Sequence, residues 1–220
     1  MDLVIFDLDG TLVDSKHDLV NSVNATRRHM GLSHLDHDLV AGYVGRGAPA
    51  LIRSSLGEQA SDTDLERGLE YFLAYYREHM LDCTRLYPGV VDSIERLQAA
   101  GVRMAILTNK PVRFSEQMIH RLDLTDRFFR IYGGNSFEQK KPHPIGIDKL
   151  CEESGIAKDR TIMIGDSAVD VRTARNAGVR SCGVTYGFQP ESFVDDPPDV
   201  IVDSMADITE MLLDERTGRS

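Results

Sequence analysis

Two carboxylates spaced for chemistry stand near the beginning of the chain. Asp7 and Asp9 belong to the segment DLDGT, which directly follows the apolar run Leu3–Phe6. Residues two apart on an extended backbone face the same side. We therefore expect both side chains at the C-terminal end of a strand, which is where open α/β sheets bind ligands.

A second acidic pair, Asp166 and Asp170, follows another apolar run, Thr161–Ile164. If the two pairs gather at one edge of a sheet, their charges repel one another unless a cation lies between them. Hard carboxylate oxygens are the ligands that Mg²⁺ takes in proteins. The two acidic pairs therefore predict a Mg²⁺ site.

Three polar residues lie between the two acidic pairs along the chain. Thr108 and Asn109 follow the apolar run Val102–Leu107, and Lys141 lies in the segment KKPHP. Each residue alone is a common surface feature, so only their order and the strands before them distinguish them.

Short apolar segments alternate with amphipathic ones along most of the chain. Runs rich in β-branched residues are typical of buried parallel strands, and here they cover 3–6, 102–107, 129–132, 161–164, 181–185 and 200–202. The segments between them predict helices over 92–100, 114–122, 145–154 and 169–177. The alternation predicts an α/β fold: a doubly wound, mostly parallel, Rossmann-like sheet.

The segment 16–83 interrupts this alternation and contains no convincing strand. Its apolar positions predict helices ending at Gly31 and at Met80, with two shorter helical pieces at 38–43 and 49–56. We therefore expect residues 1–15 and 84–220 to form an α/β catalytic core, and residues 16–83 to form an inserted helical cap domain. The polar tail 214–220 is expected to fray.

In this order, the motifs resemble those of the haloacid dehalogenase superfamily of phosphohydrolases over nearly the whole chain. They are DLDGT, Thr108-Asn109, Lys141 and the segment GDSAVD at 165–170. The resemblance implies that Asp7 is the nucleophile, which attacks phosphorus and becomes an aspartyl phosphate. It implies that Asp9 first protonates the leaving oxygen and then activates water as a base.

The resemblance also implies how the remaining motif residues act. Mg²⁺ would be held by Asp7, by the backbone carbonyl of Asp9 and by Asp166, with Asp170 as a further ligand or a neighbour of the ligands. Thr108 and Asn109 would hydrogen-bond the phosphoryl oxygens. Lys141 would neutralise charge on the transferring group, which is the dominant work in phosphoryl transfer.

The expected cap carries a loop, VGRGA at 44–48, that resembles the substrate-facing loop of phosphoglycolate phosphatases. Gly45 and Gly47 would let the backbone approach a small ligand, and Arg46 could clamp a carboxylate. The resemblance thus implies a Mg²⁺-dependent phosphomonoester hydrolase acting on 2-phosphoglycolate. Two alternatives stay open within the family: a β-phosphoglucomutase-like sugar-phosphate mutase, and a pyrophosphatase or nucleotidase.

Composition excludes some partners. Lys and Arg number 25 against 35 Asp and Glu, which gives a net charge of −10 at pH 7. Proteins that bind nucleic acid or coat anionic membranes carry the opposite balance. No leader and no long apolar run is evident, so a cytoplasmic location is expected. The expected partner is a small phosphorylated metabolite, and the sequence leaves monomer and homodimer both open.

Overall fold

Six parallel strands form the sheet that carries the functional residues, in a computed structural model that describes residues 1–217. The strand order is β5-β4-β1-β6-β7-β8, so β1 lies inside the sheet between β4 and β6. The predicted doubly wound α/β fold is therefore confirmed. The strands are β1 Leu3–Phe6, β4 Arg103–Leu107, β5 Arg130–Tyr132, β6 Thr161–Gly165, β7 Arg180–Val184 and β8 Val200–Val202.

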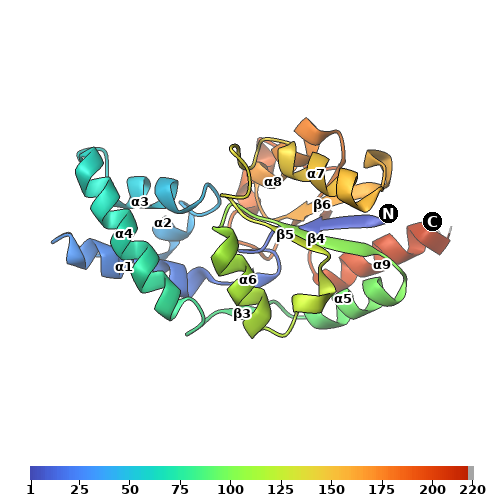
Figure 1. Ribbon diagram of the computed structural model, residues 1–220, viewed down its shortest axis with the longest axis horizontal. Coiled ribbons are helices and arrows are strands. Elements are labelled where there is room, and N and C mark those ends of the chain that lie inside the picture. Colours follow the sequence, from blue (N-terminus) through green and yellow to red (C-terminus); the bar gives the residue numbers. More distant parts are fainter. Residues whose placement is uncertain (218–220) are drawn as a thin grey trace.

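Helices cover both faces of this sheet (Figure 1). Successive residues of β1 serve the two faces in turn: Leu3 and Ile5 pack with α7 and α8, and Val4 and Phe6 pack with α5, α6 and α9. This alternation is why β1 is apolar throughout. The helices are α5 Val90–Ala99, α6 Val112–Arg121, α7 Ile145–Ser154, α8 Ala168–Ala177 and α9 Met205–Thr217.

Most predicted elements end within two residues of the observed ones. The elements not predicted from the sequence are the two-residue strands β2 (Val13–Asp14) and β3 (Arg85–Leu86), short 3₁₀ turns and the last helix, α9. Residues 214–217 of the tail expected to fray belong to α9, and 218–220 lie outside the described residues. The 3₁₀ turns are η1 Thr125–Arg127, η2 Lys158–Arg160 and η3 Pro190–Val194.

Four helices between β2 and β3 form the insert, which lies at the left of Figure 1. The long α4 packs against α1 and α3, and it begins with a capping box in which Ser61 and Asp64 satisfy each other's backbone N–H groups. Phe72 and Tyr76 are among the buried residues of α4. The helices are α1 Lys16–His29, α2 His37–Ala41, α3 Ala48–Leu56 and α4 Asp62–His79.

The chain passes between core and insert twice, and the two passages are tied together. β2 (Val13–Asp14) pairs antiparallel with β3 (Arg85–Leu86). The buried carboxylate of Asp18 in α1 accepts hydrogen bonds from the backbone N–H groups of Cys83 and Thr84, at 2.8–3.0 Å. These contacts lie beside the predicted boundaries at 16 and 83, which stay a prediction. None of the described helices is long and apolar enough to cross a membrane.

Candidate active site

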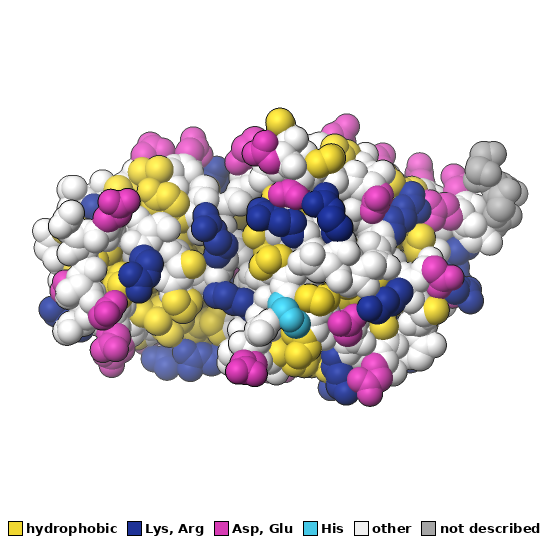
Figure 2. Space-filling model, turned by 90° about the horizontal axis from the view of Figure 1, so that it is seen from above, with side chains coloured by type: hydrophobic (Ala, Val, Ile, Leu, Met, Phe, Trp, Pro, Cys, Tyr) yellow, Lys and Arg dark blue, Asp and Glu magenta, His cyan; other side chains and the backbone are white. Residues whose placement is uncertain are grey.

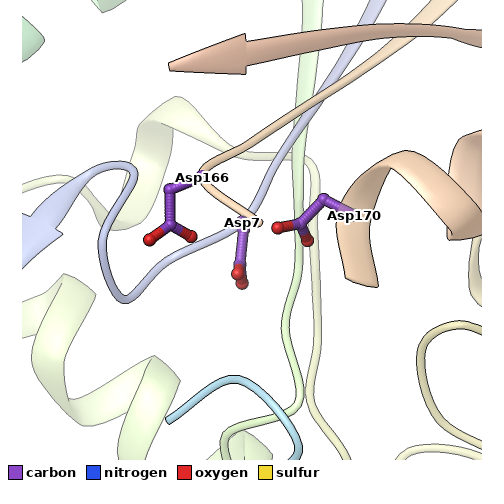
Figure 3. A group of neighbouring side chains, drawn as sticks. All are labelled: Asp7, Asp166 and Asp170. Atoms are coloured by element: carbon purple, nitrogen blue, oxygen red, sulfur yellow. The ribbon is translucent and has the colours of Figure 1, made fainter. Parts of the chain in front are cut away.

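Three buried carboxylates meet at the C-terminal ends of neighbouring strands. Asp7 follows β1, Asp166 follows β6, and Asp170 lies in the first turn of α8. Each offers an oxygen, and these oxygens lie within 4.8 Å of one another. Figure 3 shows the three carboxylates grouped in one space. The two predicted acidic pairs thus come together in the fold, with Asp7, Asp166 and Asp170 at their centre.

Glycines make room for these acids. Gly10 has φ +82°, and a Cβ built on it would lie 2.1 Å from Oδ2 of Asp166. A Cβ at Gly165 would lie 2.2 Å from Cγ of Asp170. The backbone of both motifs therefore approaches the carboxylates more closely than any residue with a side chain permits.

A single buried lysine faces two of the acids. The Nζ of Lys141 lies 3.0 Å from Oδ1 of Asp7 and 2.6 Å from Oδ1 of Asp170, and its side chain is 1% exposed. Burial opposes the charge of Lys141, but the carboxylates of Asp170 and Asp7 raise its pKa above the usual value. Lys141 is therefore a fixed positive charge beside the predicted nucleophile.

The acids themselves are held in an unfavourable environment. Burial, reinforced by Asp170 and opposed by Lys141, raises the pKa of Asp7 to about 6. Burial, with the charges of Asp170 and Asp7, also raises the pKa of Asp166 well above its usual range. More positive charge than Lys141 alone provides is therefore needed to keep all the carboxylates of the cluster ionised at neutral pH.

These residues fit a magnesium ion. Three ionised carboxylates against one ammonium leave two negative charges in a buried space, and all three offer hard oxygen ligands. The backbone N–H of Phe188 donates a hydrogen bond to Oδ2 of Asp166 at 2.6 Å and fixes the position of that carboxylate. Asp7, Asp166 and Asp170 could hold Mg²⁺, which would supply neutralising charge for chemistry on a phosphate.

We expect Mg²⁺ to stabilise the fold more strongly as the pH rises. In the metal-free protein, an acid whose folded pKa is raised binds a proton more tightly when folded, so Asp7 removes stability as the pH rises from 3.8 to about 6. Mg²⁺ offsets this loss by replacing the protons. The increase in Tm on adding Mg²⁺ should therefore be larger near about pH 8 than near about pH 5. An increase that is equal at both pH values would contradict a metal site at these acids.

Asp9 lies beside the acidic group but makes different contacts. Its carboxylate accepts hydrogen bonds from the Ser15 hydroxyl at 2.5 Å and from Nζ of Lys110, which lies 2.9 Å from both carboxylate oxygens. Lys110 in turn donates to the hydroxyl of Tyr76 at 2.5 Å. Neither Lys110 nor Tyr76 is among the site residues predicted from the sequence. The available signal was the position of Lys110 directly after the Thr108-Asn109 motif.

The structure places Thr108 and Asn109 at the end of β4, where both line the pocket beside Asp7. The Nδ2 of Asn109 donates to the carbonyls of Gly45 and Lys141, at 2.8 and 3.0 Å. Both side-chain amide hydrogens of Asn109 are therefore already used in hydrogen bonds, one to the cap and one to the core. Any phosphoryl contact from Asn109 would then come from its backbone N–H.

The predicted substrate loop lies over the site, but its arginine points elsewhere. Gly45 and Gly47 line the pocket, whereas the side chain of Arg46 is exposed and lies outside the lining that the described residues form. The carbonyl of Arg46 accepts a hydrogen bond from Lys140 at 2.6 Å. Nε2 of Gln189 donates to three more carbonyls of this segment, those of residues 41, 42 and 44, at 2.8–3.3 Å. Core side chains thus hold the loop by its backbone.

The pocket between cap and core is small and has an apolar wall. Its volume is about 50 Å³, which gives room for a handful of water-sized groups. Leu51 and Phe72 from the cap and Phe114 and Phe188 from the core line it together with the buried acids. Lys and Arg side chains lie near the junction of cap and core as well as over the rest of the face that Figure 2 shows, with acidic side chains among them.

Comparison with known proteins identifies the class of enzyme that has this fold and this site. A model of the haloacid dehalogenase-like hydrolase family matches residues 4–184. The chain belongs to this family, and it is a phosphatase that resembles the family's phosphoglycolate phosphatases.

The similarity extends over nearly the full length of the relatives. The phosphoglycolate phosphatase of Chromobacterium violaceum is 38% identical over 213 residues, which cover 95% of each chain. That of Agrobacterium fabrum is 37% identical and aligns with 99% of this chain and 94% of its own. The crystal structure of a predicted phosphoglycolate phosphatase from Haemophilus somnus superposes with a TM-score of 0.89 at 31% identity, covering 96% of this chain and 97% of that one.

Proposed function

We propose that this chain hydrolyses small phosphomonoesters with the help of Mg²⁺, forms an aspartyl phosphate on Asp7, and has 2-phosphoglycolate as its substrate. The observation that carries the proposal is the buried group of Asp7, Asp166 and Asp170, two of which form ion pairs with Lys141. The small pocket and the names of the relatives support the choice of substrate.

In the first half of the reaction, an oxygen of Asp7 forms a bond to phosphorus as the bond from phosphorus to the substrate oxygen breaks. Asp9 gives its proton to that leaving oxygen. In the second half, water attacks phosphorus, its proton passes to Asp9, and the bond between phosphorus and Asp7 breaks. Inorganic phosphate leaves, and both acids return to their starting forms.

The other residues stabilise the charge that builds up on the phosphoryl oxygens. Lys141 lies 3.0 Å from Asp7, and because its ammonium is buried, water screens its charge only weakly. Thr108 lines the pocket beside Asp7, and its hydroxyl oxygen accepts a hydrogen bond from the backbone N–H of Lys110 at 3.3 Å, which leaves the hydroxyl proton to donate. Mg²⁺, when bound by the acids, would add further positive charge at the same oxygens.

A panel of phosphorylated metabolites assayed with Mg²⁺ tests the proposal. The panel should include 2-phosphoglycolate, a hexose phosphate, pyrophosphate and a nucleoside monophosphate. We expect the highest kcat/KM on 2-phosphoglycolate, loss of all activity in excess chelator, and recovery with Mg²⁺. Conversion of one hexose phosphate into another would instead favour a mutase, and full activity in chelator would contradict the role of the metal.

Arg46 provides a test of the substrate. If Arg46 clamps the substrate carboxylate, Arg46→Ala should reduce kcat/KM on 2-phosphoglycolate more than on a phosphomonoester without a carboxylate. The difference should be roughly 2–3 kcal/mol, because charged hydrogen bonds in a closed site are lost only for the first substrate. The exposed position of Arg46 means that its side chain must turn inward when substrate binds. An equal loss on both substrates would remove the clamp from the proposal.

A further inference from the structure

Two buried lysines divide the reactive carboxylates between them. Lys141 contacts Asp7, and Lys110 contacts Asp9. The second pair is nearly as buried as the first, with side chains 4% exposed for Lys110 and 12% for Asp9. The nucleophile and the acid–base residue thus each have an ammonium of their own.

The contacts of Lys110 use its full hydrogen-bonding capacity. An ammonium has three donors, and three acceptors surround this one: both carboxylate oxygens of Asp9, at 2.9 Å, and the hydroxyl of Tyr76, at 2.5 Å. Nζ of Lys110 also lies 4.5 Å from the centre of the Tyr76 ring. A group with all its donors engaged is fixed in place, and so is the carboxylate that it holds by both oxygens.

Tyr76 brings the cap into this contact. It belongs to α4 of the cap and is 1% exposed, whereas Lys110 and Asp9 belong to the core. The ring of Tyr76 packs edge-on against Phe114 of α6, with ring centres 5.6 Å apart. The Tyr76 hydroxyl can reach Lys110 only while α4 lies against the core.

We propose that Lys110 is a positioning residue that orients the Asp9 carboxylate to take the proton from the water that hydrolyses the aspartyl phosphate, and that Tyr76 makes this orientation depend on the closed cap. The inference rests on the proposed aspartyl-phosphate mechanism. The structure shows Asp9 as a hydrogen-bond acceptor for a cation, which is the arrangement that the second half of the reaction requires.

The step balances without any further reactant. Water oxygen forms a bond to phosphorus, one water proton moves to an oxygen of Asp9, and the bond between phosphorus and Asp7 breaks to restore the Asp7 carboxylate. Lys110 keeps its three protons throughout. If Lys110 is lost, the Ser15 hydroxyl still holds one oxygen of Asp9, but the other oxygen loses its partner and can turn away from the water. Hydrolysis of the aspartyl phosphate then slows, while its formation from a good leaving group proceeds.

Rapid mixing of the full chain with p-nitrophenyl phosphate and Mg²⁺ separates these two steps. p-Nitrophenolate leaves readily without a proton, so release of the first equivalent reports phosphorylation of Asp7 and later release reports hydrolysis. For Lys110→Met, we expect a burst followed by steady turnover lowered on the order of 10-fold to 100-fold, part of the usual contribution of a general base. Intact mass after acid quenching should show one added phosphoryl group. Tyr76→Phe should show the same pattern with a smaller loss.

Three controls make the result decisive. Lys140→Met removes another lysine that bonds across to the cap but does not touch Asp9, so it should not accumulate phosphorylated protein. Lys110→Arg should restore part of the steady rate, because it keeps the charge. Tyr76→Phe keeps the lysine and tests the inference even if Lys110→Met does not fold.

Equal losses in the burst and steady phases of Lys110→Met and Tyr76→Phe, without added phosphate on the protein, would overturn the inference. Lys110 would then act on substrate binding or on the fold. Failure of the proposed function gives a different result: the wild-type chain would release no p-nitrophenolate, or Asp7→Asn would still be phosphorylated.

Discussion

Asp7→Asn should abolish turnover, with kcat lowered on the order of 10⁴-fold or more, because an amide cannot form the acyl phosphate. The fold should survive, since asparagine has nearly the same shape and removes a buried charge that is unfavourable at neutral pH. The carboxyl of Asp7 has a raised pKa, so its ionised form lowers stability above about pH 6. The metal-free variant should accordingly unfold at a temperature equal to or higher than that of the wild type near neutral pH.

The measurement is kcat on 2-phosphoglycolate with Mg²⁺, together with Tm without metal. Asp9→Asn is the matched variant: it should also turn over slowly, yet an activated ester should still phosphorylate Asp7. Turnover at the wild-type rate in an Asp7→Asn preparation free of contaminating phosphatase would exclude covalent catalysis at this residue.

Lys141→Met should produce the second-largest effect, and it should affect both activity and stability. Without Lys141 the carboxylates of Asp7 and Asp170 lose their shared partner inside the protein. Removing one member of a buried ion pair typically costs about 3–5 kcal/mol of stability. Activity should fall on the order of 10²-fold to 10³-fold, because a preorganised positive charge on the phosphoryl group is lost.

Mg²⁺ separates the two effects. Added Mg²⁺ should restore much of the Tm of Lys141→Met, because the ion neutralises the same acids, but it should leave kcat low. Thermal unfolding with and without Mg²⁺, alongside kcat at saturating Mg²⁺, checks this. Recovery of both quantities would mean that Lys141 serves only to hold the acids together.

The sequence was sufficient for the features that depend on local pattern. β1 is apolar at every position because both of its faces are covered, and Asp7 follows it because functional side chains in such sheets lie at strand ends. The order of the motifs then located the acids and Lys141. These residues meet in one buried group because β4, β1 and β6 lie side by side in that order. Short apolar runs predict a parallel sheet, but they do not predict the order of its strands.

Contacts between distant segments could not be predicted in the same way. Lys110 and Tyr76 stand 34 positions apart and meet only because α4 folds back over the end of β4. The two-residue strands β2 and β3 are too short to give a hydrophobic period. The orientation of Arg46 depends on Gln189 and Lys140, which hold its loop by backbone carbonyls that any sequence would offer.

The central place of β1 has a consequence for how the protein is made. Leu3 is synthesised well before its neighbours in the sheet, Arg103 and Thr161, which emerge from the ribosome much later. During synthesis the hydrophobic first strand must therefore wait without its partners, a situation that slows folding and exposes a chain to aggregation. The helical insert emerges in that interval, and its own helices can form from local contacts while β1 waits. A nascent chain that ends before β6 has Asp7 but neither Asp166 nor Asp170, so the buried acidic group can form only after the start of α8 has been translated.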